Sequence, residues 1–317
     1  MTAKFKKAGG SLLKDMGLDI NTIVAELRTL RLESLESRQR RDRPPKLPSR
    51  KVLVGIADGL RAVLFPNRLG LPELTNESVD YYVGHTLDVT LRELLIQVRR
   101  ELRFVSGLEA ASNADREQAT AITQAFAKRL PHIRSLLDSD IYAAYEGDPA
   151  ARSIDEVLVC YPGITAITHY RLAHELYHLG VPLIARMISE IAHSATGIEI
   201  HPGAEIGGSF FIDHGTGVVI GETAIIGEHV RLYQAVTLGA KRFPVDEHGA
   251  LVKGNARHPI VENDVVIYAG ATILGRITIG RGSTIGGNVW LTRSVPPGSA
   301  ISQAQTRNEM FDGGAGI

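Results

Sequence analysis

The segment VENDVVIYAGATILGRITIGRGSTIGGNVWL, residues 261–291, decides the fold of this chain. An aliphatic residue occurs at every sixth position, in the series Val261, Ile267, Ile273, Ile279, Ile285 and Leu291. This step fits neither the turn of an α-helix nor the two-residue alternation of a β-strand. It is typical of a parallel β-helix, in which each hexapeptide forms one face of a three-sided coil. Each coil of about 18 residues then packs only on its neighbours.

The same spacing occurs earlier in the chain with one interruption. The aliphatic positions are Ile200, Ile206, Ile212 and Val218, and then, after a slip of two residues, Ile220, Ile226, Leu232 and Leu238. Within this block the sequence IDHGTG, residues 212–217, places an Asp-His pair among the aliphatic residues. The two blocks together predict about four to five coils.

The coil is predicted to occupy residues 197–298, with one long loop. The 23 positions from Leu238 to Val261 are not a multiple of six, so residues 239–259 must leave the coil. Polar loops held by a rigid scaffold often carry function. Residues 299–317 are rich in glycine and are predicted to form a flexible C-terminal tail.

Residues 79–196 show helical spacing instead. Apolar side chains recur at intervals of three and four, as in Leu87, Leu91, Leu94, Val98 and Leu102. A second helix is predicted from Asp115 to Leu130, ending at Pro131, and others over 164–179 and 183–193. Residues 1–78 contain no chemical motif and are predicted to be an N-terminal extension. The predicted fold class is therefore α+β, with an all-helical domain before a left-handed parallel β-helix.

Composition excludes several functions. Lys plus Arg and Asp plus Glu both number 35, so no global field favours nucleic acid or an anionic membrane. The sequence has no apolar run of about 18 residues and no signal-peptide core, which predicts a cytoplasmic protein. The single cysteine, Cys160, excludes an internal disulfide and a multi-cysteine metal site. Its apolar surroundings predict a small core residue.

A zinc-like motif is also present. The sequence HELYH, residues 174–178, matches the two-histidine half of a zinc metalloprotease site. No third ligand follows at the expected spacing, and Pro182 would break the helix soon after the motif. We therefore expect no metal, and these histidines to take part in helix packing.

The motifs together resemble those of serine O-acetyltransferases. The resemblance rests on the coil from GIEIHP through IDHGTG to AVTLG, the loop that closes on RHP, the block that begins IVENDVVIYAGATILG, and the C-terminal GI. It covers roughly residues 140–300 and the last residues. It implies transfer of an acetyl group from acetyl-CoA to the hydroxyl of L-serine, which gives O-acetyl-L-serine for cysteine biosynthesis.

This chemistry requires a base, because an alcohol is a poor nucleophile while it keeps its proton. His214 is the candidate, since histidine accepts protons near neutral pH, and the resemblance implies the same role. A carboxylate on the other ring nitrogen would orient the base and stabilise the imidazolium. Asp213 is adjacent, and neighbours along a strand point to opposite faces, so Glu199 is predicted to orient His214.

The resemblance implies roles for eight further positions. Asp148 and Asp213 would receive the amino group of serine, and Arg257 and His258 would meet its carboxylate, which suits the charges of an amino acid. The pantetheine arm of CoA would lie along small residues, namely Gly239, Ala240, Ala269 and Gly270.

The resemblance also implies partners. We expect a homotrimer, or a hexamer of two trimers, with the active site between subunits. Ile317 would bind cysteine synthase, also called O-acetylserine sulfhydrylase, and L-cysteine would compete at the serine site as a feedback inhibitor. Two alternatives stay open at this point: another hexapeptide-repeat acyltransferase with a different acceptor, or a non-catalytic β-helix assembly protein.

Overall fold

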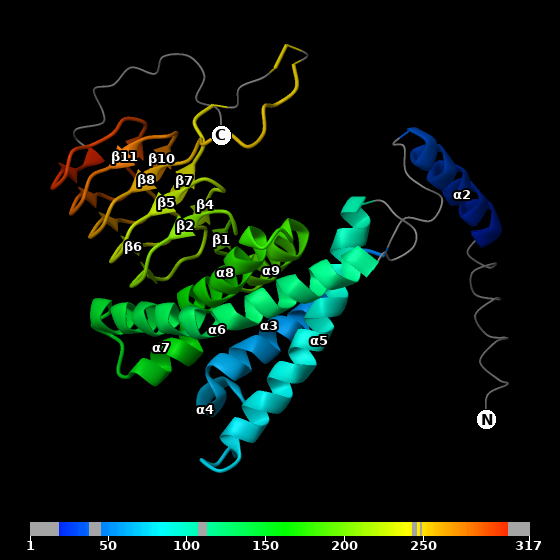
Figure 1. The fold of residues 1–317 in the computed structure, drawn as a ribbon. Coiled ribbons are helices and arrows are strands. Elements are labelled where there is room, and N and C mark those ends of the chain that lie inside the picture. The colour runs from blue at the N-terminus through cyan, green and yellow to red at the C-terminus, as the bar shows by residue number, and fades with distance from the viewer. Residues whose placement is uncertain (1–18, 38–45, 107–112, 243–245, 248, 304–317) are drawn as a thin grey trace. The chain divides into compact units, whose positions relative to one another are not determined.

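The computed structural model describes residues 19–37, 46–106, 113–242, 246–247 and 249–303 (Figure 1). The chain divides into two compact units, Met1–Lys46 and Leu47–Ile317. In the first unit the described element is α2 (Ile20–Ser37). The Asp19 carboxylate accepts the backbone N–H groups of Asn21 and Thr22 and thereby caps the start of this helix.

The second unit begins with a layer of helices. These are α3 (Arg50–Leu64), α4 (Pro66–Leu69), α5 (Val79–Ser106), α6 (Asn113–Gly147), α7 (Ile154–Cys160), α8 (Pro162–His178) and α9 (Pro182–Thr196). A proline occupies the first turn of α4, α8 and α9, where its missing N–H has no intrahelical acceptor. Helix α8 is buried on most sides, because it lies between the other helices and the coil.

Three features of this unit differ from the sequence predictions. The unit starts at Leu47 rather than near residue 79, because α3 buries apolar side chains against α5. Helix α6 continues through Pro131, since its buried face runs on from Leu130 to Ile133 and packing offsets the lost hydrogen bond. Cys160 is exposed at the end of α7 and is not a core residue.

Fourteen short strands follow α9 in the described part of the chain and form three parallel sheets. Sheet A contains β1 (Glu199–Ile200), β4 (Val219–Ile220), β7 (Thr237–Gly239), β10 (Thr272–Leu274) and β13 (Trp290–Leu291). Sheet B contains β2 (Glu205–Ile206), β5 (Ile225–Ile226), β8 (Ile260–Val261) and β11 (Thr278–Ile279). Sheet C contains β3 (Phe211–Ile212), β6 (Arg231–Leu232), β9 (Val266–Ile267), β12 (Thr284–Ile285) and β14 (Ala300–Ile301).

The register confirms the predicted β-helix of four to five coils. In sheet A the inward positions stack in the order Ile200, Ile220, Leu238, Ile273 and Leu291. The coil is the left-handed parallel β-helix expected from the six-residue step, and its aliphatic residues are buried. The long loop leaves between β7 and β8, as predicted. The coil continues slightly beyond residue 298, because β14 pairs with β12.

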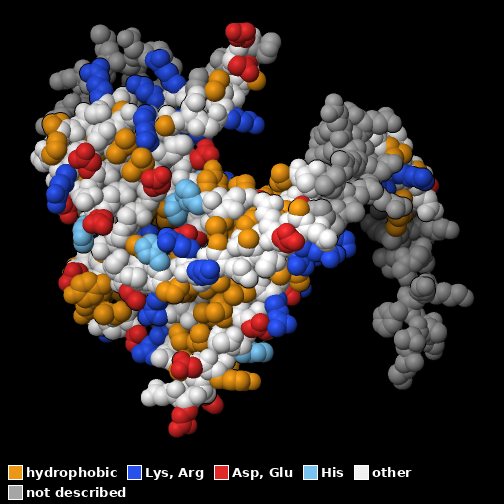
Figure 2. Space-filling view, viewed as in Figure 1, with side chains coloured by type: hydrophobic (Ala, Val, Ile, Leu, Met, Phe, Trp, Pro, Cys, Tyr) orange, Lys and Arg blue, Asp and Glu red, His pale blue; other side chains and the backbone are white. Residues whose placement is uncertain are grey.

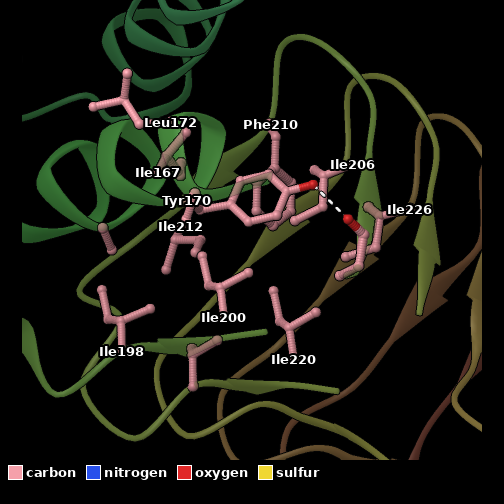
Figure 3. Packing of buried hydrophobic residues seen from close by; sticks show 14 of the residues in the cluster. Ile167, Tyr170, Leu172, Ile198, Ile200, Ile206, Phe210, Ile212, Ile220 and Ile226 are labelled. Atoms are coloured by element: carbon pink, nitrogen blue, oxygen red, sulfur yellow. Dashed lines mark hydrogen bonds between the residues drawn. The ribbon is translucent and has the colours of Figure 1, made fainter. Parts of the chain in front are cut away.

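The helical layer covers the first coil, whose outer backbone groups have no preceding coil to bond. The Tyr170 hydroxyl donates to the Ala204 carbonyl at 2.7 Å, and Figure 3 shows the ring among the aliphatic residues of the coil. Arg171 donates to the Ile206 and Gly207 carbonyls. Side chains of α8 thus take the place of a missing strand.

The Arg171 guanidinium also holds the buried Asp140 carboxylate through two bonds of 2.6 and 2.8 Å. This pair is 3% and 0% exposed. The same carboxylate accepts the backbone N–H of Phe210 at 2.9 Å. The ion pair therefore joins α6, α8 and the start of β3.

The surface agrees with the balanced charge. On the face shown in Figure 2, acidic and basic side chains are interspersed over the coil and the helical layer. None of the helices in the described ranges combines the length and the apolar character needed to cross a membrane.

Candidate active site

His214 lies at the corner between β3 in sheet C and β4 in sheet A. This is where the sequence slips by two residues, and the chain turns through left-handed conformations at His214 (φ 59°), Gly215 (φ 86°) and Gly217 (φ 78°). A side chain on Gly215 would meet Ile198 at 2.4 Å, so glycine is required there. The His214 side chain at this corner is 70% exposed.

Asp213 lies beside His214 at this corner. The distance from its Oδ1 to His214 Nδ1 is 3.7 Å, which is too long for a hydrogen bond. The alternation used to separate the two side chains does not hold, because His214 is in a left-handed turn and not in a strand. Glu199 lies half-buried on β1, and the described residues show no hydrogen bond or ion pair between it and His214. Its orienting role stays a prediction.

Asp148 follows the last residue of α6 and approaches the same corner. The Tyr161 hydroxyl donates to Asp148 Oδ2 at 2.5 Å, and the Ala150 N–H donates to Oδ1 at 2.8 Å. The Tyr161 hydroxyl, followed by the Ala150 N–H, lowers the pKa of Asp148, and the charges of Arg231 and His214 act in the same direction. Asp148, Asp213 and His214 of the same chain therefore lie near one another at this corner.

Arg231 joins these groups, although the sequence reasoning missed it. Its Nη2 donates to Asp213 Oδ2 at 2.7 Å. Its guanidinium carbon lies 4.9 Å from the Phe211 ring centre and 4.7 Å from that of Tyr233. The end of α6 packs on the same place, since a Cβ on Gly147 would meet Phe211 at 2.9 Å. The signal available in the sequence was an arginine on an outward position of a coil face.

Arg257 and His258 lie in a second cluster, at the end of the long loop before β8. Arg257 Nη2 bonds Glu222 Oε2 at 2.6 Å, and the Tyr177 hydroxyl donates to the other oxygen of Glu222 at 3.2 Å. Thr223 Oγ1 accepts the backbone N–H groups of both Arg257 and His258. Glu222 and Thr223 thus hold the two predicted residues, and neither was found from the sequence.

The second cluster contains two histidines whose protonation is disfavoured. Burial, followed by the positive charge of Arg257, lowers the pKa of His258 to about 4. Burial, followed by Arg186, lowers the pKa of His201 to about 4. His258 Nδ1 accepts the Thr223 N–H at 3.1 Å, so the proton of the neutral ring is on Nε2. His258 is therefore neutral near pH 7 and polar without being charged.

These two histidines predict a pH dependence of stability. Their folded pKa lies below the ordinary value of 6.5, so the unfolded chain binds more protons between about pH 6.5 and about pH 4. The contribution of the two histidines to the free energy of unfolding is therefore fully present above about pH 6.5. It decreases as the pH falls through this window. Thermal unfolding midpoints across this range measure it. His201→Gln should flatten the slope, and an unchanged slope would contradict the assignment.

The two clusters occupy different corners of the three-sided coil. Asp213 and His214 are at the corner from sheet C to sheet A, whereas Arg257 and His258 are at the corner from sheet A to sheet B. Sheet A lies between them within one chain. A site that uses both clusters would therefore need the second cluster from a neighbouring copy.

The four predicted CoA positions lie along sheet A and its corners. Ala269 and Gly270 are on the same corner as His214, two coils further along, and Gly239 ends β7. Three of their backbone groups are used within the coil: Ala269 O accepts from Asn288, Gly270 N donates to Gln234, and Gly239 O accepts from Gly275. The small side chains at these four positions leave room for an extended chain.

The HELYH motif takes part in packing. His174 Nδ1 bonds the Pro202 carbonyl at 2.9 Å and therefore carries the proton. The rings of His174 and His178 contact each other, with centres 4.4 Å apart. The described residues contain no group of three or more His, Cys, Asp or Glu side chains placed to hold a metal ion.

Comparison with known proteins identifies the family. The sequence model described as bacterial transferase hexapeptide (six repeats) matches residues 258–293. The chain is 61% identical over 308 residues to a plasmid serine acetyltransferase of Synechococcus elongatus, with 96% of each chain covered. The chain belongs to the serine acetyltransferase family. The resemblance predicted from its motifs is confirmed.

Solved structures of the serine acetyltransferase family share the fold. Serine acetyltransferase 1 of Entamoeba histolytica, in complex with L-cysteine, is 38% identical, with a TM-score of 0.66 over 83% of this chain and 89% of that one. The serine acetyltransferase of Neisseria gonorrhoeae, in complex with serine, is 26% identical, with a TM-score of 0.52 over 78% of this chain and 94% of that one.

Proposed function

We propose that this member of the serine acetyltransferase family transfers the acetyl group of acetyl-CoA to the hydroxyl of L-serine. The observation that carries the proposal is the group of Asp148, Asp213 and His214 at one corner of the coil. His214 is exposed there, Asp148 is half-buried and Asp213 is buried. Two carboxylates suit the ammonium of an amino acid, and an imidazole beside them suits its hydroxyl.

In the proposed reaction His214 removes the proton from the serine hydroxyl while the oxygen attacks the thioester carbonyl. The carbon–sulfur bond then breaks, and the CoA sulfur leaves with the proton returned by the imidazolium. The Asp213 carboxylate lies 3.7 Å from His214 Nδ1. Glu199 would orient the base after a rotation of the exposed His214 ring toward β1.

The substrate carboxylate would be bound by Arg257 and His258 of a neighbouring subunit. The two clusters lie on different corners of one coil, and a trimer with its axis along the coil could bring such corners together. Glu222 holds the Arg257 guanidinium from one side and leaves other N–H groups for a second carboxylate. Trimer and hexamer both satisfy this requirement.

Acetyl-CoA is the implied cosubstrate, and its pantetheine arm would lie along the line of small residues at Gly239, Ala240, Ala269 and Gly270. This line includes the corner that carries His214, which suits delivery of the thioester to the base. A cytoplasmic location, where acetyl-CoA is available, is part of the same proposal.

Release of CoA thiol from acetyl-CoA in the presence of L-serine tests the function. Turnover is expected with L-serine, and much less with amino sugars or simple amines, which lack the carboxylate that Arg257 would bind. Turnover with one of those acceptors but not with serine would favour another hexapeptide-repeat acyltransferase. No thiol release with any acceptor would favour a non-catalytic assembly protein.

One regulator follows from the same proposal. L-Cysteine has the ammonium and carboxylate of serine, so it should compete with serine for Asp148, Asp213 and Arg257. The structure of the Entamoeba histolytica relative in complex with L-cysteine supports this expectation.

We propose that Ile317 binds cysteine synthase, although this residue lies outside the described ranges. Deletion of Ile317 should weaken the complex at least about tenfold, because it removes the apolar anchor and shifts the terminal carboxylate back to Gly316. Titration of cysteine synthase against the two forms measures it. Equal affinities would contradict the role of the tail.

A further inference from the structure

Tyr161 has a contact that the proposed reaction does not yet explain. Its hydroxyl donates to Asp148 Oδ2 at 2.5 Å across a separation of 13 residues in sequence. The hydrogen bond to Asp148 and burial raise the pKa of Tyr161 to about 12, so the phenol stays protonated and remains a donor. With the Ala150 N–H on Oδ1, both Asp148 oxygens have a fixed donor.

The backbone around Tyr161 is held against the strand that leads to His214. Tyr161 links α7 to α8, and its N–H donates to the Val157 carbonyl. Two residues later, a Cβ on Gly163 would lie 2.4 Å from the Ile212 carbonyl oxygen of β3, so the start of α8 touches this strand directly. The position of the phenol is therefore tied to the strand that ends at Asp213.

The Asp148 side chain needs another group to hold it in place, because it lies just beyond the end of a long helix. Helix α6 ends at Gly147, and the segment from Asp148 to Ser153 is not helical. A side chain in such a segment has several positions open to it unless another group fixes one. The Tyr161 hydroxyl supplies that fixed point, and Arg231 does the same for Asp213.

We propose that Tyr161 is a positioning residue that aims the Asp148 carboxylate at the ammonium of the amino-acid substrate. The inference rests on the proposed function, since it needs an amine-bearing acceptor at this corner. It assigns Tyr161 no contact with the reacting hydroxyl or the thioester.

Tyr161→Phe tests this role, because it removes one hydroxyl and keeps the ring. The KM for L-serine should rise about 5- to 30-fold, as expected for loss of a hydrogen bond to a charged group. The kcat and the KM for acetyl-CoA should stay within about twofold. Tyr142→Phe is a matched control: this exposed tyrosine of α6 bonds the Glu146 carboxylate, which has no role in the proposed site.

Two further readouts separate positioning from general damage. Loss of the hydroxyl should raise the pKa of Asp148, so the acidic limb of kcat/KM for serine should move to higher pH. Inhibition by 3-hydroxypropanoate, which has the hydroxyl and carboxylate but no amine, should be unchanged in Tyr161→Phe.

An unchanged KM for serine in Tyr161→Phe, or equal loss of serine and 3-hydroxypropanoate binding in that variant, would overturn the inference. The proposed function would still stand as long as the wild-type protein turns over serine. Absence of wild-type turnover with serine would overturn both.

Discussion

Replacing His214 with alanine is expected to reduce kcat with L-serine and acetyl-CoA about 100- to 10,000-fold. The imidazole is the group placed to accept the hydroxyl proton, and general-base catalysis contributes about that much. The KM values should change little, because Asp148, Asp213 and Arg257 keep their places. Release of CoA thiol measures the rate, with His132→Ala on the exposed surface of α6 as control. Retained turnover in His214→Ala would contradict the proposed base.

A mixture of two impaired variants tests whether each active site takes residues from two subunits. His214→Ala and Arg257→Gln damage different corners of the coil, so a trimer assembled from both contains some sites with both residues intact. Mixed assemblies, made by unfolding and refolding the two together, should recover part of the activity. Absence of recovery in verified mixed assemblies would place the whole site in one chain. Glu199→Gln, measured beside these, shows whether the orienting carboxylate contributes.

Arg171→Met is expected to have the largest effect on stability. It leaves the buried Asp140 carboxylate without its counter-ion and removes the donors to Ile206 and Gly207. Loss of one partner of a buried pair costs about 3–5 kcal/mol, which corresponds to a fall in the unfolding midpoint of about 10 °C. Thermal unfolding followed by circular dichroism measures the midpoint.

The exposed pair of Arg129 and Glu175 gives the control. Arg129 is 49% exposed and bonds Glu175 at 2.9 Å, so Arg129→Met should cost no more than about 1 kcal/mol. Equal midpoints for Arg129→Met and Arg171→Met would contradict a special role for the buried pair.

The fold was predictable because the six-residue step is a local property of the sequence. The inward series through Ile273 and Leu291 follows directly from it, and so does the departure of the loop after Leu238. Helix boundaries were less predictable. Pro131 lies inside α6 because burial on both sides of it outweighs a local rule.

The site was predictable only where a motif marks it. His214, Asp213 and Arg257 stand in recognisable sequence patterns, and the structure places them at two corners of the coil. Tyr161 and Arg231 act through contacts between segments that are distant in sequence, and no spacing rule links them to Asp148 or Asp213. Such pairs follow from the packing of α6 and α8 on the coil, which sequence periodicity does not describe.

The side chains of Tyr170 and Arg171 end the stack of coils on its N-terminal side. A stack of parallel strands has no natural length, and its bare end would recruit any further strand as a template, including that of another copy. Because the Ala204 and Ile206 carbonyls already accept hydrogen bonds from Tyr170 and Arg171, they cannot pair with a further strand at this end. A fragment that starts at residue 197 would present these carbonyls uncovered and should join end to end into filaments.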